Sequence, residues 1–238
     1  MNGFGDAEAR LDQASSRIEE LRPKLDQAVA TGEVSGRLKT DVAEVIEHLR
    51  AALDYCAYEL YQRHGAPTKH GRPPKVYFPI VGAGQDFASI LRQKIPGLAK
   101  SRPDLARLLE TYQVTADPAN EWLCDLAMLA VESKHQKLSV QKPHTRRALR
   151  VSDGRAGIQV AEGGSVTIEN VAFGEHVIKG PEKVDVDHPP RDFTGQVDHV
   201  SDVFIGWRLG GRPVAVLAFL LQARNGVRHI LQEVARLA

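Results

Sequence analysis

The sequence has few residues of the kinds that mark an exported or metal-bound protein. It contains only two cysteines, Cys56 and Cys124. Both fall on the apolar faces of predicted helices, so we expect buried, reduced thiols rather than a disulfide or a metal site. Reduced thiols are typical of cytoplasmic proteins, and we expect this chain in the cytoplasm.

Long apolar runs are also missing. The longest one, residues 214–221, is far shorter than the roughly 20 residues that cross a bilayer. The opening residues MNGFGDAEARLDQ are polar almost at once, so we expect no signal sequence and no membrane partner. With 31 Lys and Arg against 30 Asp and Glu, the net charge is only +1. Any electrostatic function must therefore depend on the local placement of charges.

The sequence lacks the motifs of common cofactor sites. It has no Gly-rich phosphate loop, no nucleophile elbow and no zinc-finger spacing. One loop-rich segment concentrates possible metal ligands, namely Asp185, Asp187, His188, Asp192, Asp198, His199 and Asp202. These residues follow no fixed ligand spacing, so we interpret the segment as an exposed acidic loop and expect neither a metal nor a cofactor.

The clearest pattern in the chain is an amphipathic helix over residues 41–64. Apolar residues recur there at alternating steps of three and four, at Val42, Val45, Ile46, Leu49, Leu53, Cys56 and Leu60. This spacing places them in one stripe of a helix. Asp41, with Glu44 three residues later, is typical of a capping box, so we expect the helix to begin at Asp41.

Similar patterns predict helices over residues 6–30, 87–94, 101–112, 118–138 and from about 213 onward. Pro23 should kink or break the first of them. Ser101 and Asp117 are expected to cap the third and fourth. Residues 76–80 are expected to be a short extended piece packed on the helices.

Alternating runs predict short strands at residues 157–160, 165–168, 175–178 and 203–209. We therefore predict an α+β fold, a bundle of about four to five helices with a small antiparallel sheet inserted before the last helix. The expected divisions are a helical bundle over 1–145, an inserted β subdomain over 146–211 and a C-terminal helix over 212–238 that completes the bundle.

Two stretches, residues 60–85 and 134–152, contain no Asp or Glu. Each stretch begins at the C-terminal end of a predicted helix. If these two helix ends lay at the same end of the bundle, the two stretches would form one positive surface suited to the phosphates of RNA, DNA or a nucleotide. The second stretch supplies the candidate phosphate contacts Lys134, His135, Arg146, Arg147 and Arg150. The alternative is that these cations complement helix macrodipoles and keep loops in solvent.

Arg50 and Asp54 lie one turn apart near the edge of the apolar stripe. One interpretation is an intrahelical ion pair. The other is that Asp54 holds Arg50 so that it points across the bundle toward Lys134 and His135, which makes Arg50 a further phosphate-binding candidate. Three nearby tyrosines, Tyr55, Tyr58 and Tyr61, are suited either to stacking on bases or to packing with their hydroxyls at the core boundary.

The segment EHLRAALDYCAYEL at residues 47–60, the later YFPI, the Trp-Leu helix ending in ESKHQKL and the closing amphipathic helix resemble a group of uncharacterised bacterial proteins. Their helical core is similar to the HEPN superfamily. The resemblance covers roughly residues 37–140 and the last helix. It implies a bundle that often dimerises, and in many branches cuts RNA without a metal through an R-x(4–6)-H motif. We therefore expect a homodimer.

Two stretches match this motif. Arg224 to His229 lies on a predicted bundle helix, as the superfamily requires, whereas Arg63 to His70 runs into a loop rich in Pro and Gly. The resemblance thus implies Arg224 and His229 as catalytic residues, with His moving the proton of a 2′-hydroxyl and Arg stabilising the phosphorane. Five residues along a helix turn side chains about 140° apart. The pair can converge only if Gly226 loosens the helix or a dimer mate supplies one group; otherwise both belong to a solvated helix face.

The leading hypothesis is a HEPN-like protein that binds RNA or nucleotide phosphates at a local basic pole. The stronger version of this hypothesis adds catalysis and makes the protein a metal-independent endoribonuclease of a toxin or defence type. The alternative is a non-catalytic interaction or sensing module that docks a protein partner or a small ligand.

Overall fold

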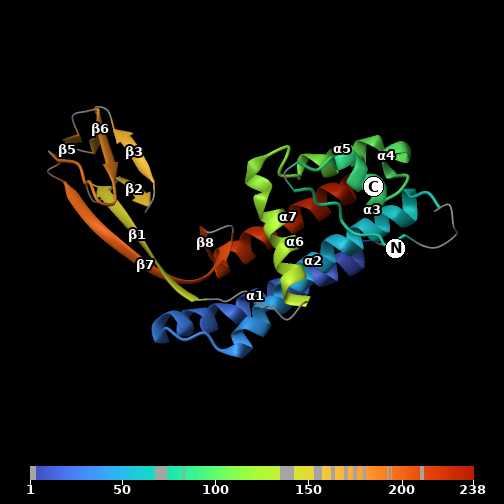
Figure 1. Ribbon diagram of the computed structural model, residues 1–238, viewed down its shortest axis with the longest axis horizontal. Helices are drawn as coiled ribbons and strands as arrows, with labels where there is room; N and C mark the ends of the chain where they lie inside the picture. The colour runs from blue at the N-terminus through green and yellow to red at the C-terminus, as the bar shows by residue number, and fades with distance from the viewer. Residues whose placement is uncertain are drawn as a thin grey trace. The chain divides into compact units, whose positions relative to one another are not determined.

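The computed structural model describes residues 4–67, 74–82, 84–134, 142–152, 157–161, 164–168, 171–173, 176–178, 181–191, 193, 195–209 and 212–238. Long helices come first, short antiparallel strands follow, and a last helix ends the chain (Figure 1). The α+β prediction is therefore confirmed. By its internal contacts the chain divides into two compact units, a helical unit of residues 1–142 with 205–238 and a β unit of residues 143–204.

The helical unit contains the helices α1 (Gly5–Thr31), α2 (Gly36–His64), α3 (Phe87–Lys94), α4 (Leu98–Ser101), α5 (Pro103–Thr111), α6 (Glu121–Lys134) and α7 (Val216–Leu237), with the 3₁₀ turn η1 (Pro118–Asn120) before α6. Helices α1 and α2 form a long hairpin, against which α7 packs; α6 contacts both α2 and α7. None of the helices in the described part of the chain has the length and apolarity that a membrane-spanning helix needs.

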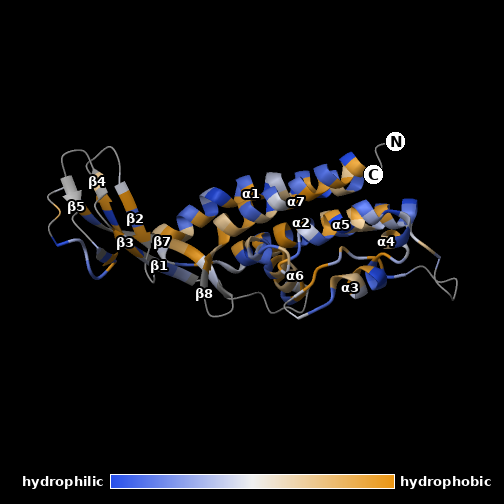
Figure 2. Cartoon of the chain, turned by 90° about the horizontal axis from the view of Figure 1, so that it is seen from above, coloured by the Kyte–Doolittle hydropathy of each residue, from blue (hydrophilic) through white to orange (hydrophobic). Residues whose placement is uncertain are grey.

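The core of this unit is built from the predicted apolar stripes. The whole α2 stripe from Val42 to Leu60 is buried, including Cys56. It faces the stripe of α1 that contains Leu11, Ile18 and Leu25. Figure 2 shows that apolar and hydrophilic residues alternate along α1, α2 and α7 as amphipathic packing requires.

The start of α2 differs from the prediction. The helix begins five residues before Asp41, and the Ser35 hydroxyl caps it by accepting a hydrogen bond of 3.1 Å from the Leu38 amide. Leu38 is buried and adds one turn to the apolar stripe, which explains the earlier start. The Asp41 cap was therefore wrong; its carboxylate instead accepts a hydrogen bond from Lys24 of α1.

Helix α1 runs through Pro23 as a single element, with Leu21 and Leu25 buried on either side of it, so the helix does not break there. A further local prediction was wrong. Ser101 does not cap α5; it ends α4, and its hydroxyl donates to the His64 carbonyl oxygen at 2.7 Å. The predicted cap at Asp117 is confirmed, because its side chain accepts a hydrogen bond from the Ala119 amide at 2.9 Å.

Residues 74–82 form an irregular segment that packs on the bundle, as expected for residues 76–80. Phe78 and Val81 are buried, and the Phe78 amide donates to Asp54 Oδ1 at 2.9 Å. The buried Gln113 side chain accepts from the Val81 amide at 3.0 Å and donates to the Pro79 carbonyl oxygen at 3.1 Å. The segment is thus fixed to α2 on one side and to the end of α5 on the other.

The strands are β1 (Lys142–Ser152), β2 (Gly157–Ala161), β3 (Ser165–Ile168), β4 (Val171–Phe173), β5 (His176–Ile178), β6 (Glu182–Asp185), β7 (Gln196–Leu209) and β8 (Arg212–Ala215). Strand β1 lies between β2 and β7, β3 pairs with β6, and β4 pairs with β5, all antiparallel where the register is defined. A small core of the β unit contains Leu149, Val151, Val160, Ile168 and Val184. In the helical unit, β8 pairs with the end of β7, so that Val214 lies opposite Trp207.

Candidate functional site

The cations at the end of α2 are already paired or buried. Arg63 donates to Glu59 Oε1 at 2.7 Å, and its guanidinium carbon lies 4.9 Å from the centroid of the Phe4 ring. His64 is half-buried, and burial together with Arg102 and Arg63 lowers its pKa. His70, the histidine of the R-x(4–6)-H match that begins at Arg63, lies outside the described residues.

The ends of α2 and α6 do not meet. The Ser133 hydroxyl, one residue before the end of α6, donates to Glu47 Oε1 at 3.4 Å. Glu47 lies 17 residues before His64, which corresponds to about 25 Å along α2. These helix ends therefore do not form one positive surface. Lys134 is the last residue of α6, and its side chain and His135 lie outside the described part of the chain.

The remaining phosphate candidates lie on β1 of the β unit, where Arg146, Arg147 and Arg150 follow each other along the strand. Arg147 lies 3.3 Å from Asp187 Oδ1, and Arg150 donates to Gln159 Oε1 of β2 at 3.3 Å. Arg147 and Arg150 are exposed, but each has a partner on the surface of its own unit.

The predicted catalytic pair contacts two different helices. Arg224 donates to Asn225 Oδ1 at 3.2 Å and 3.1 Å, and lies 3.6 Å from Glu19 Oε1 of α1. The His229 ring packs edge-on against Tyr112, next to the end of α5, with a centroid distance of 5.7 Å. Among the described residues, no hydrogen bond or ring contact joins Arg224 to His229.

Gly226 does not loosen α7 between them. The helix is continuous from Val216 to Leu237. A Cβ atom at Gly226 would lie 2.3 Å from Trp122 Cζ2, so the glycine makes room for the Trp122 ring of α6. Its role in this chain is close helix packing.

A cavity of about 330 Å³ instead brings together residues of three helices. It is lined by Arg10 of α1, by Glu44, Glu47, His48, Arg50, Ala51 and Asp54 of α2, and by Ala130 of α6. Of the sequence-predicted site residues whose side chains the structure describes, Arg50 alone lines it. We call it the α1–α2–α6 cavity.

Arg50 is the most constrained residue of this cavity. Its Nη2 lies 2.8 Å from Asp54 Oδ1 and donates to the Phe78 carbonyl oxygen at 3.3 Å. The intrahelical ion pair is therefore present, and it also fixes the irregular segment. The second terminal nitrogen, Nη1, is buried and has no hydrogen-bond partner within the described part of the chain. A buried N–H group without an acceptor costs free energy, so an acceptor that reached it would be bound favourably.

His48 contributes a neutral donor. Arg10 Nη1 lies 3.4 Å from His48 Nδ1, and because arginine can only donate, Nδ1 accepts and the neutral ring carries its proton on Nε2. Burial, followed by the charge of Arg10, lowers the pKa of His48; Arg17 also lowers it, whereas Glu44 and Glu47 raise it. The ring is therefore neutral at pH 7, with one donor and no charge.

The carboxylates of the cavity have partners of their own. Asp54 accepts from Arg50 and from the Phe78 amide, and Glu47 accepts from the Ser133 hydroxyl. Glu44 lies 4.0 Å from Arg17 Nη2. What the cavity offers beyond these pairs is a set of N–H donors, which suits an oxyanion.

Sequence reasoning missed Arg10 and His48, since neither belongs to a motif. The only available signal was the hairpin register. Helices α1 and α2 run antiparallel, so residues progressively earlier in α1 contact residues progressively later in α2, as in Lys24 with Asp41 and Arg17 with Glu44. The next contact in this series joins Arg10 to His48.

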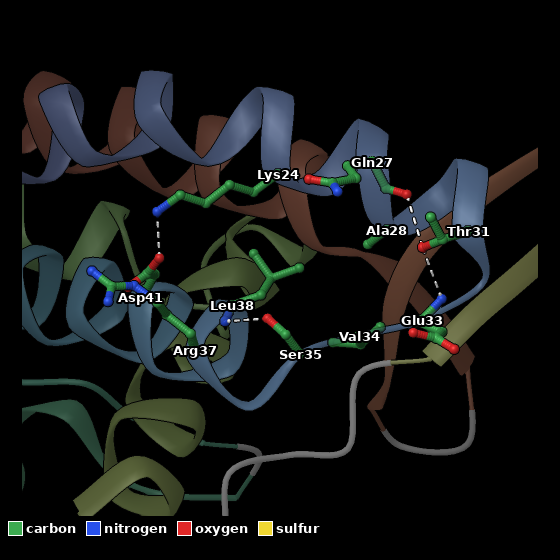
Figure 3. Close-up of a pocket in the computed structure, with 10 residues that line it drawn as sticks. All are labelled: Lys24, Gln27, Ala28, Thr31, Glu33, Val34, Ser35, Arg37, Leu38 and Asp41. Carbon is green, nitrogen blue, oxygen red and sulfur yellow. Dashed lines mark hydrogen bonds and ion pairs between the residues drawn. The ribbon is translucent and has the colours of Figure 1, made fainter.

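A second cavity, of about 390 Å³, lies at the turn between α1 and α2 (Figure 3). Its polar groups are used in holding the turn together: Lys24 pairs with Asp41, and Ser35 caps α2. The Thr31 hydroxyl donates to the Gln27 carbonyl oxygen and accepts from the Glu33 amide. We interpret it as a structural turn.

The acidic segment of the β unit also forms a turn. Asp185 Oδ1 accepts from the amides of Asp187 and His188 and lies 2.8 Å from His188 Nδ1. Among the described residues, no three His, Cys, Asp or Glu side chains are grouped to hold a metal ion.

Comparisons with protein-family models, with curated proteins and with solved structures found no match for this chain.

Proposed function

We propose that this chain is a HEPN-like protein that binds RNA or a nucleotide through a phosphate group held by Arg10, His48 and Arg50. The observation that carries the proposal is the buried Nη1 of Arg50, which has no acceptor among the described residues and belongs to a side chain that lines a cavity of about 330 Å³. Guanidinium groups match phosphate oxygens in geometry and charge, and charge-assisted hydrogen bonds are the stronger ones.

The arrangement of charges favours a single phosphate in the cavity over an extended polyanion on its rim. Glu44, Glu47 and Asp54 also line the cavity, so only a group that reaches the N–H donors gains more than it loses to repulsion. A neutral His48 Nε2–H adds a donor without requiring a further counter-ion.

RNA cleavage is the second part of the proposal, and it involves two copies of the chain. Within one chain Arg224 contacts Glu19, whereas His229 packs on Tyr112. We propose that a metal-independent endoribonuclease of the toxin or defence type would pair Arg224 of one copy with His229 of its mate, which makes a homodimer part of this activity. Cleavage of total RNA in EDTA that His229→Ala abolishes would support it; equal cleavage by wild type and variant would remove it.

Binding is tested with fluorescently labelled RNA in EDTA, by comparing wild type with Arg10→Gln. Arg22→Gln is the matched control, because Arg22 lies on the same helix and pairs with Glu19 at 2.8 Å away from the cavity. Loss of one charge-assisted contact should weaken binding about tenfold or more, and should reduce the salt slope by about one. The control should bind like wild type. Equal affinities for all three proteins would contradict the proposal.

The alternative, an interaction or sensing module, is favoured by one observation. Met128 and Val131 lie three residues apart on α6 and are 40% and 57% exposed, which is high for apolar side chains. A module that docks a protein would co-purify with its partner and would not respond to RNA. A binder of nucleic acid should instead lose affinity as the salt concentration rises.

A further inference from the structure

An exposed aromatic ring lies next to the α1–α2–α6 cavity. Tyr55 directly follows the cavity residue Asp54 and is 39% exposed. The Arg10 guanidinium carbon lies 5.7 Å from the centroid of its ring. Because the same guanidinium group contacts His48 Nδ1, Arg10 connects the ring with the proposed phosphate site.

Helix geometry places this ring at a useful distance from the cavity. Tyr55 lies four residues after Ala51, which lines the cavity, and residues four apart are neighbours on one face of a helix. The backbone of Tyr55 therefore lies about 6 Å along α2 from that of Ala51. In a nucleotide, the phosphate and the base are likewise separated, because a ribose lies between them.

We propose that the cavity takes a nucleotide unit whose phosphate binds at Arg10 and Arg50 and whose base stacks on Tyr55. This inference rests on the proposed function and adds the residue that recognises the base, so that a nucleotide binds more tightly than a simple phosphate or a sugar phosphate. Every base has a π-face, so the stack accepts any of them and confers no sequence preference.

Tyr77 provides a matched control. It is 42% exposed, and a cation lies beside its ring as well, with Lys94 Nζ 5.5 Å from the centroid. Tyr77 does not line the cavity, and its cation comes from α3. Tyr55→Leu and Tyr77→Leu therefore remove equally exposed rings, only one of which is linked to Arg10.

The experiment titrates wild type, Tyr55→Leu, Tyr55→Phe and Tyr77→Leu with adenosine 5′-monophosphate and with ribose 5-phosphate in EDTA. Wild type, Tyr55→Phe and Tyr77→Leu should bind the nucleotide about tenfold more tightly than the sugar phosphate. Tyr55→Leu should lose this preference and retain its affinity for ribose 5-phosphate.

Two other results overturn different parts of the account. Equal affinity of wild type for both compounds, or a preference that survives in Tyr55→Leu, would contradict stacking and leave the phosphate site intact. Binding of neither compound by wild type would overturn the phosphate site, and the stacking with it.

Discussion

Trp122 packs against the backbone of α7 at Gly226, where a Cβ atom would lie 2.3 Å from the ring. Alanine is the better helix former by about 1 kcal/mol. Overpacking a buried site nevertheless costs about 1–3 kcal/mol, so Gly226→Ala should lower the free energy of unfolding in urea. Gly36→Ala is the control, because nothing lies within 4 Å of a Cβ there. If both variants were as stable as wild type, the close packing would be refuted.

His48 links stability to pH at the level of one residue. Its pKa is lowered by burial and by Arg10, so the unfolded chain takes up a proton first as the pH falls below about 6.5. The stability that neutral His48 contributes is therefore fully present above that pH and decreases below it. His64, whose pKa is lowered too, behaves in the same way.

His48→Gln should therefore reduce, without abolishing, the loss of stability between pH 7.5 and pH 5. The measurement is a series of urea unfolding curves across this range. A variant whose stability falls with pH as steeply as that of wild type would show that His48 is not the group concerned.

At the scale of elements, Asp54 fixes the irregular segment to α2. Its carboxylate accepts hydrogen bonds from the Phe78 amide and from Arg50. Phe78 is buried and Arg50 is half-buried. Hydrogen bonds to charged groups contribute about 1.5–3 kcal/mol each, so Asp54→Ala should cost at least about 2 kcal/mol in urea unfolding. Glu59→Ala removes another ion pair of the same helix and spacing, Glu59 with Arg63. An equal cost for both would mean that the Phe78 contact adds nothing.

The sequence was most informative where an apolar stripe decides the structure. Helix α3 was predicted with its observed ends, and the stripes of α1, α2 and α7 are buried as expected. Strand β1 was missed because its first half, KPHTRR, contains no apolar residue that could show an alternation. Its pairing with β2 depends on Leu149 and Val151, which lie in a core assembled from several short strands.

The candidate site was only partly predictable, because sequence spacing shows contacts within one helix but not contacts between helices. Arg50 stood out because Asp54 lies one turn away on the same helix. Arg10 and His48 are 38 residues apart in the sequence, so their proximity requires the antiparallel register of α1 and α2. That register depends on the length of the turn after Thr31, including Gly32 in a left-handed conformation.

At the scale of the whole molecule, a stretch of sequence without acidic residues does not leave its described arginines without partners. A turn that is distant in sequence supplies one carboxylate, since Arg147 of β1 pairs with Asp187 at 3.3 Å. The neighbouring strand β2 supplies another acceptor, Gln159 Oε1, to Arg150. We therefore place the proposed phosphate site in the α1–α2–α6 cavity, where Arg50 Nη1 has no acceptor among the described residues, rather than on strand β1 with its three arginines.

The central claim is that the phosphate ligand binds on α2 in the helical unit. It is tested most directly by photocrosslinking 4-thiouridine-labelled RNA to the full chain and identifying the modified peptides by mass spectrometry. We expect crosslinks on α2 at residues 48–58, lost in Arg10→Gln and retained in Arg22→Gln. Crosslinks confined to strand β1 around Arg147 and Arg150, with none on α2, would contradict it.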